Sequence, residues 1–405
     1  MGYIKRDLEE KIKKYLKRRE MIAIVGARQA GKTTILKHIL KDLKNAKFVS
    51  FDDQIALRTF TEDVDLFVKE YVENTDFLFI DEFQYAKEGG KKLKYIYDNY
   101  KIKIIISGSS VAELSVQSLK YLVGRIFIFT LFPLSFTEFL RYKNPDFYEI
   151  LDSKKISQIM IERMHILYKE YVIFGGYPEV VLANNKEEKI EILRNIYNTY
   201  LLREIREILQ IGDDSKLTKL IKALSLQAGN LVNYNELSVI VGLDYRELVK
   251  HIDILIKTFV IMKSVPFFTN KRKELVKTPR LFFVDSGFRN IIISNFQKLE
   301  DRTDLGSLNE NFVASELLKK GFKLNYWRTK AGAEVDFIIE KDNKEIPIEV
   351  KSNLTSFRYG RSFKNFIIDY DCARGFILSN TLIGKISFNK VKIDFVPVFL
   401  ISKML

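Results

Sequence analysis

The stretch MIAIVGARQAGKTTILKHIL, residues 21–40, decides the fold class. Residues 21–25 are all apolar, which is typical of a strand buried on both faces. Residues 26–33 match the pattern G-x-x-x-x-G-K-[ST] in full, and a helical apolar pattern follows directly. In such a strand, loop and helix, the backbone N–H groups and the helix N-terminus point toward a phosphate group. The stretch therefore predicts a nucleotide-binding loop in an α/β fold.

The side chains of this loop have expected roles. The ammonium of Lys32 would reach the β- and γ-phosphates, and the hydroxyl of Thr33 would bind Mg²⁺. A glycine turn that only resembles the motif is the alternative, but the strand and the helix around it favour a phosphate site. The residues expected to bind the nucleotide are Gly26, Ala27, Arg28, Gln29, Ala30, Gly31, Lys32, Thr33 and Thr34.

Further apolar runs alternate with helical patterns and predict a parallel sheet. One of these runs ends in Asp81 and Glu82. Downstream of a phosphate loop, Asp81 is expected to hold the metal's water shell and Glu82 to polarise the attacking water. Another run ends at Ser107 and Ser109, whose hydroxyls either sense the γ-phosphate or are ordinary turn residues. The predicted strands are residues 21–25, 47–51, 76–80, 103–106 and, as a possible fifth, 126–129.

Several short motifs together resemble a large family of prokaryotic P-loop ATPases of the AAA type, which carry an additional C-terminal region. This resemblance implies ATP as the nucleotide, Mg²⁺ as the metal, and ATP hydrolysis as the activity. It also makes Arg125 a candidate to act at the γ-phosphate, in its own chain or in a neighbouring subunit, while a surface ion pair is the alternative. The motifs are GARQAGKTT (26–34), DEFQ (81–84), SGSS (107–110), GR (124–125), FPLSFTEFL (132–140), FGGYPE (174–179), FFVDSG (282–287) and ENFV (310–313).

A helix-turn-helix pattern is predicted in the second half of the chain. Helical patterns over residues 235–241 and 245–258 flank the turn Gly242-Leu243, and the two apolar runs that follow suggest a winged helix. The second helix mixes acidic and basic side chains, whereas helices that read DNA normally present a basic face. The basic residues 271–273 would lie in the wing. DNA contact and protein contact therefore both remain open.

Alternating residues on both sides of Asp342-Asn343 predict a β-hairpin with this pair as its turn. In that register Asp336 lies directly opposite Glu349. Two like charges at such positions are destabilising unless a positive group compensates them, and hard divalent cations take carboxylate oxygens. Pro347 suggests that its strand lies at a sheet edge or leaves its N–H side unpaired.

Glu310, Asp336, Glu349 and Lys351, called the carboxylate cluster below, resemble the core of PD-(D/E)xK nucleases. There a helix and two strands supply a metal site for phosphodiester hydrolysis. A second metal site with Lys351 beside it is therefore a hypothesis. The alternative is a solvent-facing hairpin in which Glu334 and Lys351 form an ion pair and a proton or a water relieves the two facing carboxylates.

Composition limits the class of protein. The 405 residues are 47% hydrophobic and 29% charged, and the net charge of +14 is spread along the chain. The single cysteine, Cys372, excludes a disulfide within the chain, and three widely separated histidines disfavour a His-based metal site. No run approaches the ~18 apolar residues of a membrane span, and the N-terminus lacks the apolar core of a secretory signal. We expect a cytoplasmic protein without a membrane partner.

The sequence thus predicts an α/β chain that combines a P-loop NTPase sheet and a helical extension (1–205), a winged helix (206–290) and a nuclease-like α/β domain (291–405). The expected function is Mg²⁺-dependent ATP hydrolysis coupled to a partner, either DNA or another protein. One alternative is a nucleotide-gated protein that binds or cleaves DNA with the carboxylate cluster. Another is a regulatory ATP-binding module with negligible turnover. The sequence leaves the oligomeric state open.

Overall fold

The computed structural model describes residues 2–108, 119–151, 156–199, 205–211, 214–268 and 278–405. Its contacts divide the chain into two compact units: Met1–Pro133 with Lys257–Phe259, and Leu134–Ile256 with Val260–Leu405. The predicted three-domain division, with boundaries after residues 205 and 290, remains a prediction. Within the described ranges, no helix has the length and apolar character needed to cross a membrane.

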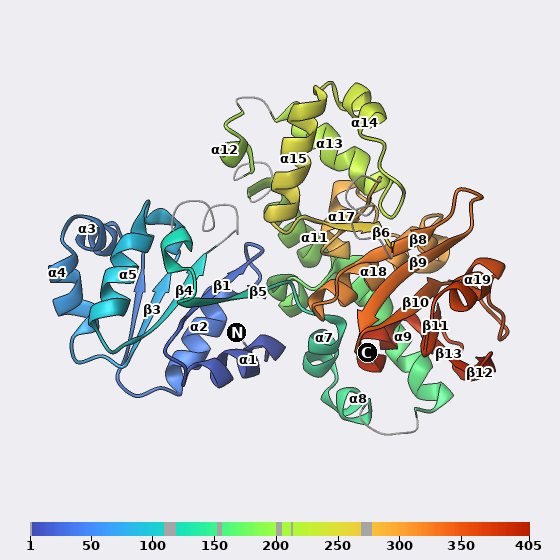
Figure 1. The fold of residues 1–405 in the computed structure, drawn as a ribbon, viewed down its shortest axis with the longest axis horizontal. Coiled ribbons are helices and arrows are strands. Elements are labelled where there is room, and N and C mark those ends of the chain that lie inside the picture. The colour runs from blue at the N-terminus through green and yellow to red at the C-terminus, as the bar shows by residue number, and fades with distance from the viewer. Residues whose placement is uncertain (1, 109–118, 152–155, 200–204, 212–213, 269–277) are drawn as a thin grey trace. The chain divides into compact units, whose positions relative to one another are not determined.

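The first unit contains a five-stranded sheet in which all neighbouring strands are parallel (Figure 1). The predicted parallel α/β sheet is therefore confirmed. Every residue of the two central strands, β1 and β4, is buried, which explains their continuous apolar sequences. The strands, in spatial order, are β2 (Ala46–Ser50), β3 (Phe77–Asp81), β4 (Lys103–Gly108), β1 (Met21–Gly26) and β5 (Ile126–Leu131).

Helices connect these strands, and the strand order brings three loops to one edge of the sheet. Because parallel strands all end at the same edge, the residues that follow β1, β3 and β4 lie together there. The helical elements of this unit are α1 (Asp7–Tyr15), α2 (Lys32–Lys41), α3 (Gln54–Glu62), α4 (Val64–Phe67), η1 (Val68–Val72), η2 (Phe83–Tyr85), α5 (Gly89–Asn99) and η3 (Leu119–Leu122).

The second unit begins with helices and ends in a mixed sheet. The turn at Gly242 is formed by a left-handed residue with φ 75°. The side chain of Asp244 accepts the N–H groups of Arg246 and Glu247 at 2.8 and 3.0 Å and so caps the start of α15. The helices are α7 (Phe136–Lys143), α8 (Pro145–Ile150), α9 (Gln158–Phe174), α10 (Pro178–Leu182), α11 (Lys186–Ile196), α12 (Ile205–Leu209), α13 (Ser215–Leu226), α14 (Tyr234–Val241), α15 (Tyr245–Lys257), α17 (Ser286–Ile292), η5 (Leu299–Asp301), α18 (Leu305–Lys319), α19 (Arg361–Asp369), η6 (Val398–Leu400) and α20 (Ile401–Met404).

One eight-stranded sheet runs through the second unit. The two strands predicted for the wing, β6 and β7, pair with each other, and β6 also pairs in parallel with β8. They therefore continue the C-terminal sheet. In spatial order the strands are β12 (Gly384–Phe388), β13 (Val391–Pro397), β11 (Arg374–Ser379), β10 (Lys344–Val350), β9 (Glu334–Lys341), β8 (Asn325–Arg328), β6 (Ile261–Pro266) and β7 (Arg280–Phe283).

The predicted hairpin is present with the predicted turn. Asp342 and Asn343 have φ values of 53° and 58°, as a two-residue type I′ turn requires. However, β10 lies between β9 and β11, so the expectation of an edge strand at Pro347 was wrong. The strand tolerates Pro347 because its pairing with β11 starts one residue later, at Ile348. The hairpin pairs are Lys344 with Lys341, Glu345 with Glu340, Ile346 with Ile339, Pro347 with Ile338 and Ile348 with Phe337.

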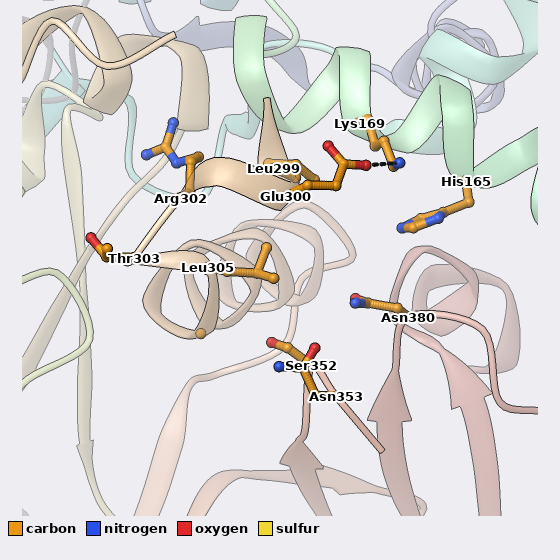
Figure 2. Close-up of a pocket in the computed structure, with 11 residues that line it drawn as sticks. His165, Lys169, Leu299, Glu300, Arg302, Thr303, Leu305, Ser352, Asn353 and Asn380 are labelled. Carbon is orange, nitrogen blue, oxygen red and sulfur yellow. Dashed lines mark hydrogen bonds and ion pairs between the residues drawn. The ribbon is translucent and has the colours of Figure 1, made fainter. Parts of the chain in front are cut away.

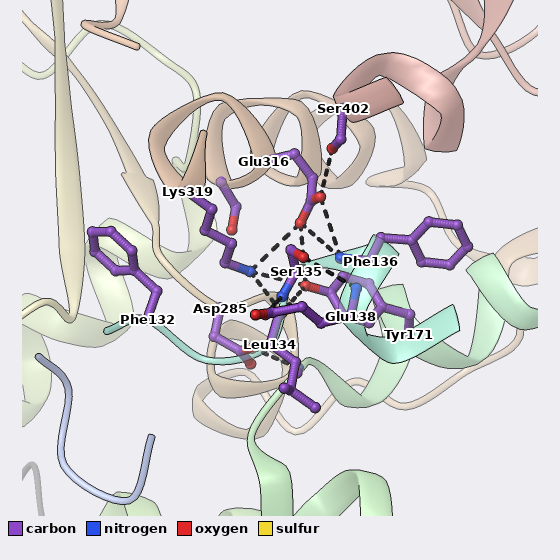
Figure 3. A network of polar contacts seen from close by, with 12 residues as sticks. Phe132, Leu134, Ser135, Phe136, Glu138, Tyr171, Asp285, Glu316, Lys319 and Ser402 are labelled. Carbon is purple, nitrogen blue, oxygen red and sulfur yellow. Dashed lines mark hydrogen bonds and ion pairs between the residues drawn. The ribbon is translucent and has the colours of Figure 1, made fainter. Parts of the chain in front are cut away.

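A buried polar network holds the start of α7 against α9 and α18 (Figure 3). The carboxylate of Glu316, only 1% exposed, accepts the N–H of Phe136 at 3.1 Å and the hydroxyl of Ser402 at 2.7 Å. The hydroxyl of Tyr171 donates to the carbonyl of Leu134 at 2.6 Å. Helices far apart in the sequence thus fix the segment that opens the second unit.

Candidate functional site

The phosphate loop joins β1 to α2 at the carboxyl edge of the first sheet. Gly26 has φ 156°, and a Cβ there would lie 2.0 Å from the carbonyl oxygen of Leu131, so close strand packing requires glycine. Gly31 has φ 96° and precedes the first residue of α2. Lys32 is 6% exposed, and its ammonium donates to the carbonyls of Gly26 and Ala27 at 3.1 and 3.0 Å. The loop therefore curls around its own lysine.

Asp81 links the end of β3 to this loop. Its Oδ2 accepts the hydroxyl of Thr33 at 2.6 Å, and its Oδ1 accepts the hydroxyl of Ser107 from β4. Asp81 is 3% exposed and Ser107 is fully buried. A hydroxyl and a carboxylate held together at the end of a phosphate loop are the oxygen ligands that Mg²⁺ prefers. The structure thus brings together the two side chains predicted to bind the metal.

Glu82 follows Asp81 with φ 54°, an uncommon backbone conformation for a residue other than glycine. Its carboxylate accepts the side-chain N–H of Gln84. Burial raises the pKa of Glu82, while this hydrogen bond acts in the opposite direction. A carboxylate with a raised pKa is a better proton acceptor for water, so its environment suits a general base.

Arg125 lies at the end of the sheet where β1 begins, opposite the end that carries the phosphate loop. Its carbonyl accepts the N–H of Met21, the first residue of β1, whereas the phosphate loop begins at the last residue of that strand. The first and last residues of the six-residue β1 are five steps apart, which corresponds to ~17 Å. The guanidinium of Arg125 pairs with Asp98 at 3.1 Å. Within one chain, Arg125 therefore does not reach the phosphates, and its action on a neighbouring subunit stays a prediction.

Four predicted positions fall on segments without described structure. Ser109 lies outside the described residues, as do the basic residues 271–273 of the predicted wing. Arg28, Gln29 and Thr34 of the phosphate loop are exposed, as residues that present their backbone to a ligand can be.

Arg6 supports the loop, and sequence reasoning missed it. The guanidinium is 5% exposed and donates to the carbonyl of Ala30, within the loop, at 2.7 Å and to the carbonyl of Phe132 at 2.6 Å. No motif marks Arg6, because its two acceptors are backbone atoms. The only available signal is a basic residue just before the first amphipathic helix.

The carboxylate cluster forms on α18, β9 and β10 of the second unit. Lys351 Nζ pairs with Glu349 Oε1 at 2.8 Å. The side chain of Asp336 accepts the N–H of Val350 at 2.8 Å. The ion pair between Glu334 and Lys351, which the alternative interpretation expected, does not form, since Glu334 pairs with Arg280 and Arg328.

Burial controls the ionisation of the cluster. Glu349 is 5% exposed, and burial raises its pKa. Burial also raises the pKa of Asp336, and together with the charge of Asp336 it raises the pKa of Glu310 to about 7. Oε2 of Glu349 is buried and has no hydrogen-bond partner within the described part of the chain. Within the described residues, the cluster therefore contains one buried carboxylate oxygen that no hydrogen bond satisfies.

The cluster does not form a ready-made metal site. Among the residues that the structure describes, no group of three or more His, Cys, Asp or Glu side chains is arranged to hold a metal ion. The predicted convergence of Glu310, Asp336 and Glu349 on one ion is thus not present in this conformation. The charge of Arg280 acts on this cluster, since it lowers the pKa of Glu310 and Asp336 against the effect of burial.

A cavity of about 540 Å³ opens in the second unit, where β10 and β11 end near the first turn of α18 (Figure 2). The ammonium of Lys169 pairs with Glu300, and Arg302 pairs with Asp304 at 2.8 Å. The charges at the cavity are therefore balanced, in contrast to those of the carboxylate cluster. The lining residues are His165, Lys169, Leu299, Glu300, Arg302, Thr303, Leu305, Gly306, Ser352, Asn353 and Asn380.

Comparison with protein families divides the chain into three matched segments. Residues 18–140 match a family described as an AAA domain, which is a P-loop ATPase domain. Residues 165–299 and 305–397 match two domains of unknown function, DUF8612 and DUF4143. The AAA match contains the phosphate loop, Asp81, Glu82 and Arg125. The first unit therefore has an AAA-type P-loop ATPase fold.

Whole-chain relatives occur in bacteria and archaea. An uncharacterized protein of Haemophilus influenzae is 26% identical over 345 residues, which cover 81% of both chains. One from Methanocaldococcus jannaschii is 27% identical over 383 residues and covers 90% of this chain and 80% of its own. Among solved structures, a Walker-type ATPase of Pyrococcus abyssi is similar at 14% identity and a TM-score of 0.49, covering 72% of this chain and 96% of its own.

Proposed function

We propose that the chain binds ATP with Mg²⁺ on residues 26–34 and hydrolyses it, with turnover coupled to a protein or DNA partner. The observation that carries this proposal is the hydrogen bond of 2.6 Å between Thr33 and Asp81, at the point where the phosphate loop meets the end of β3. The sequence motif alone would indicate a phosphate-binding loop but not the ligands of its metal ion. This contact adds a pair of oxygen ligands at the position where such a loop needs its metal.

The residues of the site divide the work of hydrolysis. When bound, ATP supplies the γ-phosphoryl group, and Mg²⁺ neutralises its charge. Lys32 exchanges its bonds to the carbonyls of Gly26 and Ala27 for bonds to phosphate oxygens. Glu82 takes a proton from the attacking water, and Gln84 holds the Glu82 carboxylate in place. Ser107 fixes the orientation of Asp81 from β4.

Replacing Glu82 by Gln tests this division. Removing a general base lowers the turnover number by about 10²- to 10⁴-fold, while ATP affinity stays close to that of the parent. Glu88→Gln is the matched control, because Glu88 is an exposed carboxylate six residues further on. Steady-state phosphate release and equilibrium ATP binding give both quantities. Equal turnover in Glu82→Gln and the parent would reject Glu82 as the base.

The same assay separates hydrolysis from regulation. A parent protein that binds ATP tightly but releases phosphate in a single turnover over hours would be a regulatory ATP-binding module. The uncommon backbone conformation of Glu82 and its bond to Gln84 are compatible with a base that needs a partner to become active.

The second candidate function is nucleotide-gated binding or cleavage of DNA by a nuclease-like domain at residues 291–405. It is favoured by the buried Oε2 of Glu349, which has no hydrogen-bond partner in the part of the chain that the structure describes, and by Lys351, which pairs with the other oxygen. With Mg²⁺ or Mn²⁺ and ATP, plasmid cleavage that disappears in Glu349→Gln, while ATP hydrolysis persists, would support it. Cleavage that survives this substitution would mean that the carboxylates are structural.

Residues 206–290 are proposed to form a winged helix that contacts protein. Helices α14 and α15 flank a short turn, and strands β6 and β7 follow. The exposed side of these helices carries Val239, Tyr245 and Val249, which are 83%, 52% and 39% exposed. Exposed apolar side chains are more typical of a protein contact than of a phosphate contact. Salt-independent capture of a protein partner would support this role, whereas a steep salt dependence of DNA binding would oppose it.

A further inference from the structure

Arg280 carries a buried positive charge into the carboxylate cluster. The residue opens β7, is 4% exposed, and pairs with Glu334 of β9. Its guanidinium lies over the ring of Tyr326 of β8, with Cζ 4.8 Å from the ring centroid. Two neighbouring strands thus hold it in place, and Nε has no hydrogen-bond partner among the residues whose structure is described.

Two features of the surrounding strands connect Arg280 to the cluster. Glu334, its ion-pair partner, is two residues from Asp336 on β9, and side chains two apart lie on the same face of a strand. Glu310 lies against Gly229, because a Cβ added to this glycine would be 3.2 Å from Glu310 Oε2. The N–H of Gly229 in turn donates to the carbonyl of Leu281, which follows Arg280 in the chain. The charge of Arg280 accordingly lowers the pKa of both Glu310 and Asp336 against the effect of their burial.

The cluster still lacks one positive partner. Glu349 is 5% exposed, and its Oε2 has no hydrogen-bond partner in the described ranges, although Lys351 binds Oε1. A buried carboxylate oxygen without a partner is costly, and a hard divalent cation is the ligand that would satisfy it. A cation that reached Glu349 and Asp336 would add a second positive charge beside Asp336, on which the charge of Arg280 already acts.

We propose that Arg280 competes with a divalent metal ion for the carboxylate cluster, so that the cluster binds the ion tightly only when Arg280 withdraws. This proposal rests on the second candidate function, because it names the device that controls that site. The charge of Arg280 already favours the ionised form of Glu310 and Asp336, and it would repel a metal ion that bound these carboxylates in a buried setting. Arg280 thereby keeps the site closed to metal in the conformation described here.

Binding of Mn²⁺ alone, without nucleotide, tests this competition on the full chain by isothermal titration and electron paramagnetic resonance. Arg280→Gln removes the charge and is expected to bind Mn²⁺ at least about tenfold more tightly than the parent. Arg280→Lys keeps the charge and is expected to stay within about threefold of the parent. Arg374→Gln is the matched control, since Arg374 pairs with the buried Asp394 at 2.6 Å elsewhere in the same sheet. The emission of Trp327, the single tryptophan, verifies that each variant is folded.

The outcomes separate the competition from the metal site itself. If Arg280→Gln binds Mn²⁺ more tightly than the parent, and the double variant Arg280→Gln/Glu349→Gln loses this binding, both the competition and the metal site are supported. If the parent and Arg280→Gln bind equally, and binding needs Glu349, the competition is wrong while the cleavage candidate stands. Absence of Glu349-dependent binding in every variant overturns both. A tenfold gain in Arg280→Lys as well would also overturn the competition, because the charge would then not be its cause.

Discussion

The phosphate loop and the carboxylate cluster differ in how well their buried charged groups are paired. In the phosphate loop, the buried charges of Lys32 and Asp81 have hydrogen-bond partners nearby. In the carboxylate cluster, one oxygen of Glu349 has no hydrogen-bond partner among the described residues, and Arg280 supplies positive charge from a distant strand. The first site is organised before its ligand binds, whereas the second one needs a further cation or a rearrangement.

The largest difference between the two sites is expected in ATP hydrolysis when the lysine of each site, Lys32 or Lys351, is replaced by Ala. Lys32→Ala should lower ATP hydrolysis by at least about 100-fold, because it removes the cation that faces the phosphates. Lys351→Ala should leave hydrolysis within about twofold, since Lys351 pairs with Glu349 in the second unit. Phosphate release at saturating ATP measures both. Similar losses in the two variants would mean that the sites do not act separately.

The sequence could predict the first site because its signal is local. The glycines, Lys32 and Thr33 lie within eight residues, and a strand of apolar residues ending in Asp81 identifies its partner. The hairpin turn at Asp342 and Asn343 was predictable for the same reason, since two adjacent residues set its register.

Other features could not be predicted, because they depend on contacts between distant residues. Arg6 binds backbone carbonyls 24 and 126 residues away, which leaves no side-chain pattern. Arg280 meets Glu334 only because β6 joins β8 and extends the C-terminal sheet. The position of Arg125, at the edge opposite the phosphate loop, follows from the parallel pairing of β5 with β1. Strands β12 and β13 were missed altogether.

A smaller effect is expected from the pH dependence of stability at Glu310. Burial and Asp336 raise the pKa of Glu310 from 4.5 to about 7. Between these values the folded chain holds a proton that the unfolded chain has lost, so its stability falls as the pH rises through this window. Gln cannot ionise. Glu310→Gln should therefore become more stable relative to the parent by up to about 3 kcal/mol between pH 4.5 and pH 8.

Thermal unfolding of the parent and Glu310→Gln across that window measures this difference. Glu300→Gln serves as the control, because Glu300 is an exposed carboxylate whose pKa is lowered by its bond to Lys169. A parallel pH dependence in Glu310→Gln and the parent would show that Glu310 is not a strained buried acid.

The smallest effect is expected at Gln84. Its side-chain N–H stabilises the charged form of Glu82 and so opposes the rise in pKa that burial causes. Gln84→Leu should therefore raise the pKa of Glu82 further. Since the base acts when deprotonated, the acidic limb of the pH profile of ATP hydrolysis should move to higher pH. An unchanged limb, with turnover intact, would show that Glu82 does not set it.

Equilibrium binding of ATP with and without Mg²⁺ tests the central claim most directly. The contact between Thr33 and Asp81 predicts that the parent binds ATP with submillimolar affinity only when Mg²⁺ is present, and that Asp81→Asn weakens the effect of Mg²⁺. Isothermal titration up to millimolar ATP gives both affinities. Failure of the folded parent to show any Mg²⁺-dependent affinity for ATP in that range would contradict the account.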